Sequence, residues 1–356
     1  MNRLPNLDPL RFVLASIVML YHIPQLCKNQ GLPYFDDLHI FHKGIEAVYM
    51  FFVLSGFLII RLIYRAKQNN TFSIGHFYIR RILRIFPLYY LVVIFGFLFY
   101  NVVLPALQIP FEINYSFGEG LFLTLFFLPN IFAELYYPGG ILEILWSIGI
   151  EEQFYLIIAP LLFFTDKGKI LKILLLLTFL YFVIFHVNYF DVLRKFNFVY
   201  FMLFFGGIIA ILEEMRKLEF LKISPIIPII IIGSTIVYFT TNVFDFNSIW
   251  INNLFMSSLF ALCIHSLACN NFNTTITIKA LIYLGQISYG IYMYHIIALN
   301  LVVFVFLKID YLKTFNEIST RILILLLTFA ITIAMAHISY KYFESYFLKQ
   351  KSKFRK

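Results

Sequence analysis

Charged residues are scarce in this chain: they make up 13% of its 356 residues, whereas hydrophobic residues make up 61%. A soluble globular chain typically carries about 25% charged residues. The shortage therefore excludes an ordinary water-soluble domain. The mean hydropathy of +0.84 agrees with this. Apolar runs of about 18 residues or more recur along the chain, and each is long enough to cross a hydrocarbon core as a helix.

Cysteine is also rare. Cys27, Cys263 and Cys269 have neither the spacing of a metal site nor that of a redox pair. Cys263 and Cys269 fall in one apolar run, where we expect them to be small core residues. We therefore expect no metal ion and no permanently bound cofactor.

The net charge of +9 does not indicate a nucleic-acid partner. The basic residues gather in the short connections between apolar runs and at the C-terminus, which is where cytoplasmic loops of membrane proteins carry them. At the other end, Arg11 lies inside the first apolar run, and no small-residue cleavage site follows before Tyr21 and His22. We therefore expect an uncleaved first span rather than a signal peptide.

The apolar runs predict an all-α fold, a polytopic integral membrane helical bundle with about ten transmembrane helices. The expected spans are Leu7–Leu26, Gly44–Ile63, Tyr78–Tyr100, Leu145–Phe164, Ile170–Val187, Phe196–Leu212, Ile223–Thr241, Ile249–Ala268, Leu284–Leu307 and Arg321–Phe343.

One further apolar stretch, Phe117–Phe132, is short and stops at a proline, so we interpret it as re-entrant or interfacial. With ten spans, the basic clusters at Arg61–Arg84, Lys167–Lys172 and Arg216–Lys222 all face one side. The positive-inside rule makes that side cytoplasmic and puts both termini there. We expect a single transmembrane domain over residues 1–348 and a basic cytoplasmic tail over residues 349–356.

Ionisable residues inside spans are costly and usually functional. In the first span, Arg11 and His22 are eleven residues apart, about three helical turns, so they project from a similar face. In the expected topology Arg11 lies near the cytoplasmic surface and His22 in the outer half. The alternative for His22 is an interfacial histidine following Tyr21.

The segment LWSIGIEEQFYL places two adjacent carboxylates, Glu151 and Glu152, shortly after Trp146 and Ser147 in a span. Glu151 and His22 are expected at comparable depth, and a carboxylate near an imidazole raises its basicity, as a general base requires. The alternative is an acidic helix start favoured by the helix dipole.

The segment HFYIRRILRIFPLYY supplies Arg81 and Arg84, which are three residues apart and share a helix face. Guanidinium pairs match phosphate geometry, so a cytosolic phosphate-bearing donor is one use for them. The other is a stop-transfer cluster that contacts anionic lipid.

The segment LGQISYGIYMYH contributes Ser288, Tyr289 and His295 to the ninth span. Small residues such as Ser288 also allow close helix packing, and a hydrogen-bonded core histidine is the alternative role for His295.

Six pieces of sequence occur in a characteristic order along nearly the whole chain. They are Arg11 with His22, FFVLSGFLI (Phe51–Ile59), RRILRIFPLYY (Arg80–Tyr90), WSIGIEEQFYL (Trp146–Leu156), LGQISYGIYMYH (Leu284–His295) and SYKYFESYF (Ser339–Phe347). In this order they resemble the acyltransferase 3 family of membrane acyltransferases.

The resemblance implies transfer of an acyl group, often acetyl, from cytosolic acyl-coenzyme A to an outward-facing acceptor. It assigns the family's essential histidine to His22, with Arg11 as its partner arginine. It assigns the family's arginine pair to Arg81 and Arg84, and the glutamate of the WSxxxE motif to Glu151. Many members carry an acidic residue where this chain has Tyr49, with Glu46 one turn earlier, which leaves the acceptor-side chemistry of that helix open.

We therefore expect an O-acetyltransferase of the bacterial inner membrane that uses acetyl-CoA and acts on a cell-surface glycan or glycolipid. In this hypothesis His22 and Glu151 are catalytic, and Arg81 and Arg84, with Arg11, hold the coenzyme A phosphates. Residues in supporting roles are Trp146, Ser147, Ser288, Tyr289 and His295. The sequence leaves open whether His22 acts as a base or becomes acylated.

Two other functions are compatible with a polytopic chain. A transporter or flippase of a polysaccharide or lipid-linked substrate would line its path with intramembrane charges, but the sequence shows no repeated pair of broken spans. The second alternative function is an inactive scaffold protein of a polysaccharide system. Such a scaffold would not need to keep His22 and Glu151.

Overall fold

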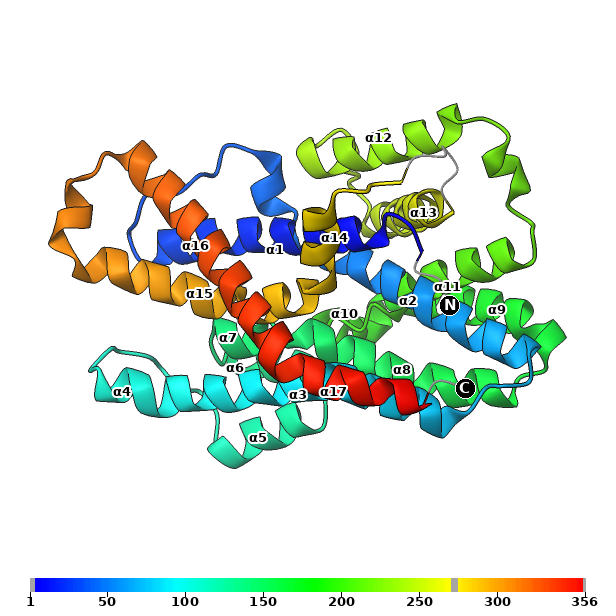
Figure 1. Ribbon diagram of the computed structural model, residues 1–356, viewed down its shortest axis with the longest axis horizontal. Helices are drawn as coiled ribbons and strands as arrows, with labels where there is room; N and C mark the ends of the chain where they lie inside the picture. The colour runs from blue at the N-terminus through cyan, green and yellow to red at the C-terminus, as the bar shows by residue number, and fades with distance from the viewer. Residues whose placement is uncertain (1–3, 270–274, 355–356) are drawn as a thin grey trace. The chain divides into compact units, whose positions relative to one another are not determined.

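The computed structural model describes residues 4–269 and 275–354, and across these ranges every regular element is a helix (Figure 1). Within these described ranges, eight helical segments are long and apolar enough to cross a membrane. They are Leu7–Asn29, Gly44–Gln68, Ile74–Ala106, Gly140–Phe164, Lys167–His186, Ile249–Ala268, Ser288–Lys308 and Glu317–Gln350. The protein is thus a polytopic membrane helical bundle, as the sequence predicts.

Three expected elements differ in detail. The run expected as one span over Leu284–Leu307 is interrupted at Ile287, which separates α14 (Lys279–Gln286) from α15 (Ser288–Lys308). Average hydropathy does not reveal the break, because the polar residues Gln286 and Ser288 on either side of Ile287 are embedded in long apolar stretches. Helices α11 (Tyr200–Glu214) and α12 (Ile226–Thr240) have 15 residues each and are shorter than the expected spans. A full crossing needs about 20 residues.

The stretch Phe117–Phe132 forms two short helices, α5 (Phe117–Leu125) and α6 (Pro129–Tyr136). Phe127, in the connection between them, has a positive φ of 57°. Neither helix is long enough to span a bilayer, in agreement with the sequence.

The chain forms two compact units, which are described separately. The first unit comprises Met1–Leu58 and Met202–Tyr340, and the second comprises Ile59–Phe201 and Lys341–Lys356.

In the first unit, α1 (Leu7–Asn29) packs along α14 and α15 (Figure 1). Helix α15 in turn packs against α16 (Glu317–Ser339), and α12 packs against α13 (Ile249–Ala268). A buried apolar cluster joins the three helices α1, α15 and α16. Its members are Ile23, Cys27, Leu299, Val302, Val303, Phe306 and Ile324.

Helices α2 (Gly44–Gln68) and α11 cross at very short distance in the first unit. A Cβ atom on Gly56 would lie 1.9 Å from the carbonyl oxygen of Leu203, and one on Gly206 would lie 1.9 Å from that of Val53. Small residues allow helix backbones to approach in a membrane, where packing replaces the hydrophobic effect between helices. The glycine of the FFVLSGFLI segment therefore has a packing role.

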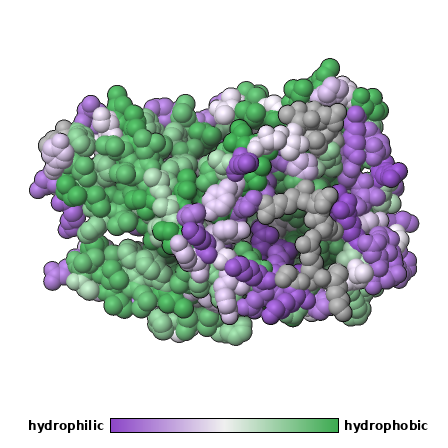
Figure 2. Space-filling model, in the orientation of Figure 1, coloured by the Kyte–Doolittle hydropathy of each residue, from purple (hydrophilic) through white to green (hydrophobic). Residues whose placement is uncertain are grey.

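The outward faces of α15 and α16 are apolar, as the green surface over these helices in Figure 2 shows. Exposed residues on these helices include Leu301, Ile322, Leu326 and Ile338. Large exposed apolar faces on long helices are expected where lipid replaces water as the solvent.

The second unit contains the end of α2 and the start of α11. Its longer helices are α3 (Ile74–Leu98), α8 (Trp146–Phe164) and α9 (Ile170–His186). A π-helical turn, Phe99–Val103, extends α3 into the short α4 (Leu104–Ala106). It also contains α5, α6 and the short helices α7 (Gly140–Glu143), α10 (Asp191–Lys195) and α17 (Ser345–Gln350).

Hydrogen bonds from two side chains, Lys67 and Gln153, fix α8 within the second unit. Lys67 Nζ donates to the carbonyl oxygens of Leu162 at 2.6 Å and Phe163 at 2.8 Å, and also to that of Thr165. These carbonyls end α8 and have no partner within the helix. Nearer the start of the helix, Gln153 Nε2 donates to Phe127 O at 2.7 Å, so α8 is tied to the α5–α6 connection.

Candidate active site

Two histidines that the sequence places 273 positions apart are neighbours in the first unit. The imidazole rings of His22 on α1 and His295 on α15 have centroids 5.2 Å apart. His295 is 1% exposed, and its Nδ1 lies within hydrogen-bonding distance of the carbonyl oxygen of Tyr292. Because a carbonyl only accepts, Nδ1 of His295 carries the hydrogen and donates it.

The second ring nitrogen of His295, Nε2, lacks the hydrogen bond that Nδ1 makes. Its Nε2 is buried and has no hydrogen-bond partner among the described residues. In a neutral imidazole with the hydrogen on Nδ1, Nε2 is a proton acceptor. His22 is half-buried and shares a hydrogen bond with the side chain of Gln25. The pair therefore places a proton acceptor, Nε2 of His295, in the helix interface beside His22.

Arg11, the expected partner of His22 in α1, forms an ion pair one turn away. Its Nη1 lies 2.7 Å from Asp8 Oδ1, and both side chains are largely covered. The charge of Arg11 is thus balanced by a carboxylate within the same helix. The expected role of Arg11 as a phosphate ligand stays a prediction.

The remaining expected residues of the first unit lie where α14 gives way to α15. Ser288 opens α15 and is 5% exposed, and Tyr289 follows it half-buried. They precede His295 by about two turns of the same helix. Their position agrees with close helix packing at the break, and their supporting role stays a prediction.

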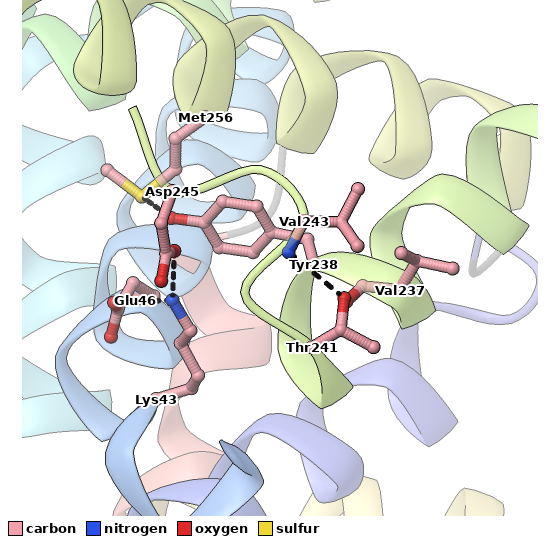
Figure 3. A network of polar contacts seen from close by, with 8 residues as sticks. All are labelled: Lys43, Glu46, Val237, Tyr238, Thr241, Val243, Asp245 and Met256. Atoms are coloured by element: carbon pink, nitrogen blue, oxygen red, sulfur yellow. Dashed lines mark hydrogen bonds and ion pairs between the residues drawn. The ribbon is translucent and has the colours of Figure 1, made fainter. Parts of the chain in front are cut away.

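A separate polar network joins the start of α2 to the segment after α12 (Figure 3). Lys43 Nζ lies 3.0 Å from Asp245 Oδ1 and 3.5 Å from Glu46 Oε1, and it stacks over the ring of Tyr238. Glu46, the acidic residue nearest to Tyr49, is therefore engaged in an ion pair.

In the second unit, Arg81 on α3 is a largely covered guanidinium group. Its Nε is buried and has no hydrogen-bond partner among the described residues. Its Cζ lies 5.9 Å from the ring centroids of both Phe77 and Tyr155. A buried donor without a partner is costly, so such a group is a candidate for ligand binding.

Further cations surround Arg81, and one of them was not expected from the sequence. Arg84 is exposed on the next turn, and Arg80 Nη1 donates to the carbonyl oxygen of Phe354 at 3.2 Å. Lys351, just beyond α17, lies close enough to interact with all three arginines. Its burial, and then its repulsion by Arg84, Arg81 and Arg80, lowers the pKa of Lys351 to about 7. This concentration of positive charge is suited to a phosphate-bearing ligand.

The two adjacent carboxylates of α8 have different surroundings. Glu151 Oε2 accepts a hydrogen bond of 2.6 Å from the hydroxyl of Tyr155. Glu152 is 6% exposed, its Oε1 has no hydrogen-bond partner among the described residues, and it interacts electrostatically with Arg81. The sequence favoured Glu151, whereas the structure also singles out Glu152 as a buried carboxylate beside the cation cluster. Their difference in burial gives no signal in the sequence, because α8 is apolar on most sides.

The WS pair that precedes these carboxylates begins α8. Trp146 is the first residue of the helix, and Ser147 is buried, with its Oγ donating to Ile144 O at 3.4 Å. The second unit thus brings Trp146, Ser147 and Glu151 onto one helix. The histidine pair belongs to the first unit, so the expected pairing of Glu151 with His22 stays a prediction.

Known protein families and curated proteins include matches to this chain. A family model described as an acyltransferase domain, acyltransferase 3, matches residues 4–337. No solved structure gives a significant match.

Curated relatives include a protein named peptidoglycan O-acetyltransferase OatA from Listeria monocytogenes, 28% identical over 82% of this chain and 48% of that protein. Another, named putative peptidoglycan O-acetyltransferase YrhL from Bacillus subtilis, is 29% identical over 43% of this chain and 23% of that protein. A third, named acyltransferase MdmB from Streptomyces mycarofaciens, is 32% identical over 43% of this chain and 38% of that protein. The chain matches less than half of the length of each of these relatives.

Proposed function

Because this chain belongs to the acyltransferase 3 family, we propose that it is a membrane O-acyltransferase of the bacterial inner membrane. The proposed donor is cytosolic acyl-coenzyme A, with acetyl as the acyl group. The proposed acceptor is a hydroxyl group of an outward-facing cell-envelope carbohydrate. Peptidoglycan is the first acceptor to test, since two relatives carry that substrate in their names.

One observation carries the catalytic part of the proposal. His22, to which the resemblance assigns the essential histidine, lies beside a second imidazole, His295, whose Nε2 is an unpartnered proton acceptor. An acceptor hydroxyl is a poor nucleophile until a positioned base removes its proton. A pair of imidazoles within an apolar helix interface supplies such a base.

In the proposed reaction, His22 takes the proton of the acceptor hydroxyl as its oxygen attacks the thioester carbonyl. A new C–O bond forms, and the C–S bond of the tetrahedral intermediate then breaks. The electron pair leaves with the coenzyme A sulfur, which takes up the proton from His22. The products are the O-acyl ester and free coenzyme A, so atoms and charges balance. A route through an acylated His22 uses the same groups in two steps.

The cation cluster of the second unit supports the choice of donor. Coenzyme A carries phosphate groups, and the partly buried guanidinium of Arg81 has an unsatisfied Nε where such an anion would bind. We propose that Arg81, Arg84 and Lys351 hold these phosphates. In this proposal Glu151 keeps its role toward His22, and Arg11 keeps its expected role with the arginine pair.

The experiment follows radiolabel from acetyl-coenzyme A into cell-envelope glycan, with membranes that contain equal amounts of wild type or His22→Ala. His42→Ala is the matched control, because His42 is exposed and interacts with Asp36 at the surface. Label in wild type and His42→Ala but not in His22→Ala supports the proposal. Equal label in His22→Ala would rule out His22 as the essential base.

A further inference from the structure

A cluster of three potential metal ligands lies in the first unit, away from the histidine pair. It consists of Glu213 at the end of α11, His265 in the last turn of α13, and Cys269 one turn later. A carboxylate oxygen, an imidazole nitrogen and the thiol sulfur of these residues all lie within 4.8 Å of one another. This set of oxygen, nitrogen and sulfur donors is the set that zinc binds in proteins.

The backbone holds two of these ligands in register. The amide nitrogen of Cys269 donates to the carbonyl oxygen of His265 at 2.9 Å, which continues the helical hydrogen-bond pattern of α13. Residues four apart lie on the same helix face. His265 and Cys269 therefore point the same way, toward the end of α11.

Glu213, the ligand from α11, already contacts His265. His265 Nε2 lies 2.8 Å from Glu213 Oε2, His265 is completely buried, and the side chain of Glu213 is 13% exposed. Tetrahedral zinc with ligand bonds of about 2.0–2.1 Å separates two such atoms by roughly 3.3 Å. Glu213 and His265 would have to move apart by only about half an ångström to admit the ion.

A lysine already occupies one of the two carboxylate oxygens of Glu213. Lys222 Nζ contacts Glu213 Oε1 at 2.6 Å, so the other oxygen of Glu213 remains directed at His265. Lys222 Nζ also lies 3.2 Å from Glu219 Oε1. A thiolate of Cys269 and the carboxylate of Glu213 would balance the charge of the ion, and Glu219 would balance that of Lys222.

We propose that Glu213, His265 and Cys269 form a zinc site that joins the end of α11 to the end of α13. Binding displaces the thiol proton of Cys269 and the proton shared by His265 and Glu213. Three protein ligands leave one position of a tetrahedral site for water. The sequence indicates no metal site, because Glu213 is 52 positions from His265 and the three cysteines lack the spacing of a metal site.

Cobalt(II) tests the proposal directly, because a bound thiolate gives it a ligand-to-metal absorption band that nitrogen and oxygen ligands do not give. The Cys27→Ser/Cys263→Ser double variant leaves Cys269 as the single thiol of the chain. We expect one cobalt ion per chain by elemental analysis, together with the thiolate band. Adding Cys269→Ser should abolish the band. Absence of the band in the double variant, or its persistence in the triple variant, would overturn the proposal.

Lys222→Met gives a second test that does not alter a ligand. Removing the competing cation from Glu213 should tighten zinc binding severalfold, as measured by competition with a chelating dye. If Glu213, His265 and Lys222 form only a structural ion-pair network, this variant will bind no zinc. That result would exclude the site.

Discussion

His22 and His295 face each other across the interface of α1 and α15, with ring centroids 5.2 Å apart and planes tilted by 41°. Two imidazoles at this distance influence each other, because protonation of one disfavours protonation of the other. If His22 accepts the proton of the acceptor hydroxyl, His295 must remain neutral while it does so. The Nδ1–H···O=C bond to Tyr292 is compatible with that neutral form.

This arrangement predicts different effects for the two histidines. His22→Ala should lower kcat by about 100- to 10,000-fold, the usual contribution of a general base. His295→Asn should lower kcat less, and the double variant should be no slower than His22→Ala, because both act in one proton transfer. Labelled acetyl transfer at saturating donor measures each rate. If the decreases in kcat of the two single variants instead add up in the double variant, the two histidines act independently and the prediction is wrong.

Arg81→Met should weaken donor binding more than it slows the chemical step. A charge-assisted hydrogen bond contributes about 1.5–3 kcal/mol, so the KM for acetyl-coenzyme A should rise roughly 10- to 100-fold. Arg216→Met is the matched control, since Arg216 is an exposed arginine of the other unit. A change in kcat with an unaltered KM would contradict the phosphate role of Arg81.

The lowered pKa of Lys351 predicts that donor binding depends on pH. Its pKa is lowered from 10.5 to about 7, so it loses its charge as the pH rises through 7. An anion favours the charged form, and donor affinity should therefore fall between pH 6 and pH 8, with uptake of a proton on binding. Lys351→Arg stays charged over this range. The phosphates of the donor also titrate, so both variants will show some pH dependence in equilibrium binding measurements. We expect Lys351→Arg to lack the additional fall in affinity that the wild type shows between pH 6 and pH 8.

The same shift affects stability. Between about pH 7 and pH 10.5 the unfolded chain holds the lysine proton and the folded chain does not. The free energy of unfolding should therefore rise with pH across this window, and the lysine should be most destabilising below pH 7. Thermal unfolding of wild type and Lys351→Met in lipid nanodiscs should converge toward high pH. Curves that stay parallel would argue against the lowered pKa.

The α2–α11 crossing predicts a stability effect at Gly206. In Gly206→Ala the new methyl group would lie 1.9 Å from the carbonyl oxygen of Val53, so the helices must separate, at a cost of about 1–3 kcal/mol. Gly233→Ala is the control: Gly233 is also helical, but nothing lies within 4 Å of its added Cβ. Its melting temperature in nanodiscs should stay the same or rise, whereas that of Gly206→Ala should fall. Equal shifts in the two variants would refute the close crossing.

Hydropathy was sufficient to predict the helical membrane fold, because each long span must be continuously apolar. It did not locate the interruption at Ile287, because the polar neighbours Gln286 and Ser288 are too few to divide a long apolar run. The motifs identified Arg81. They did not identify Lys351 as its neighbour, because the two residues are 270 positions apart and no local sequence pattern links them. Glu151 and Glu152 are adjacent, and their different surroundings depend on how α8 is rotated. A helix that is apolar around most of its circumference leaves that rotation undetermined by pattern.

The lysine that binds the carbonyl oxygens at the end of α8 also constrains how this helix can change in evolution. Lys67 fixes the carbonyls of Leu162 and Phe163, while Glu151 and Glu152 lie about three turns earlier in the same helix. Inserting or deleting one residue between them would turn the carboxylates by about 100° and shift them by about 1.5 Å along the axis. Length variation should therefore be tolerated in the connections around α8, and a single-residue insertion or deletion within it should be selected against.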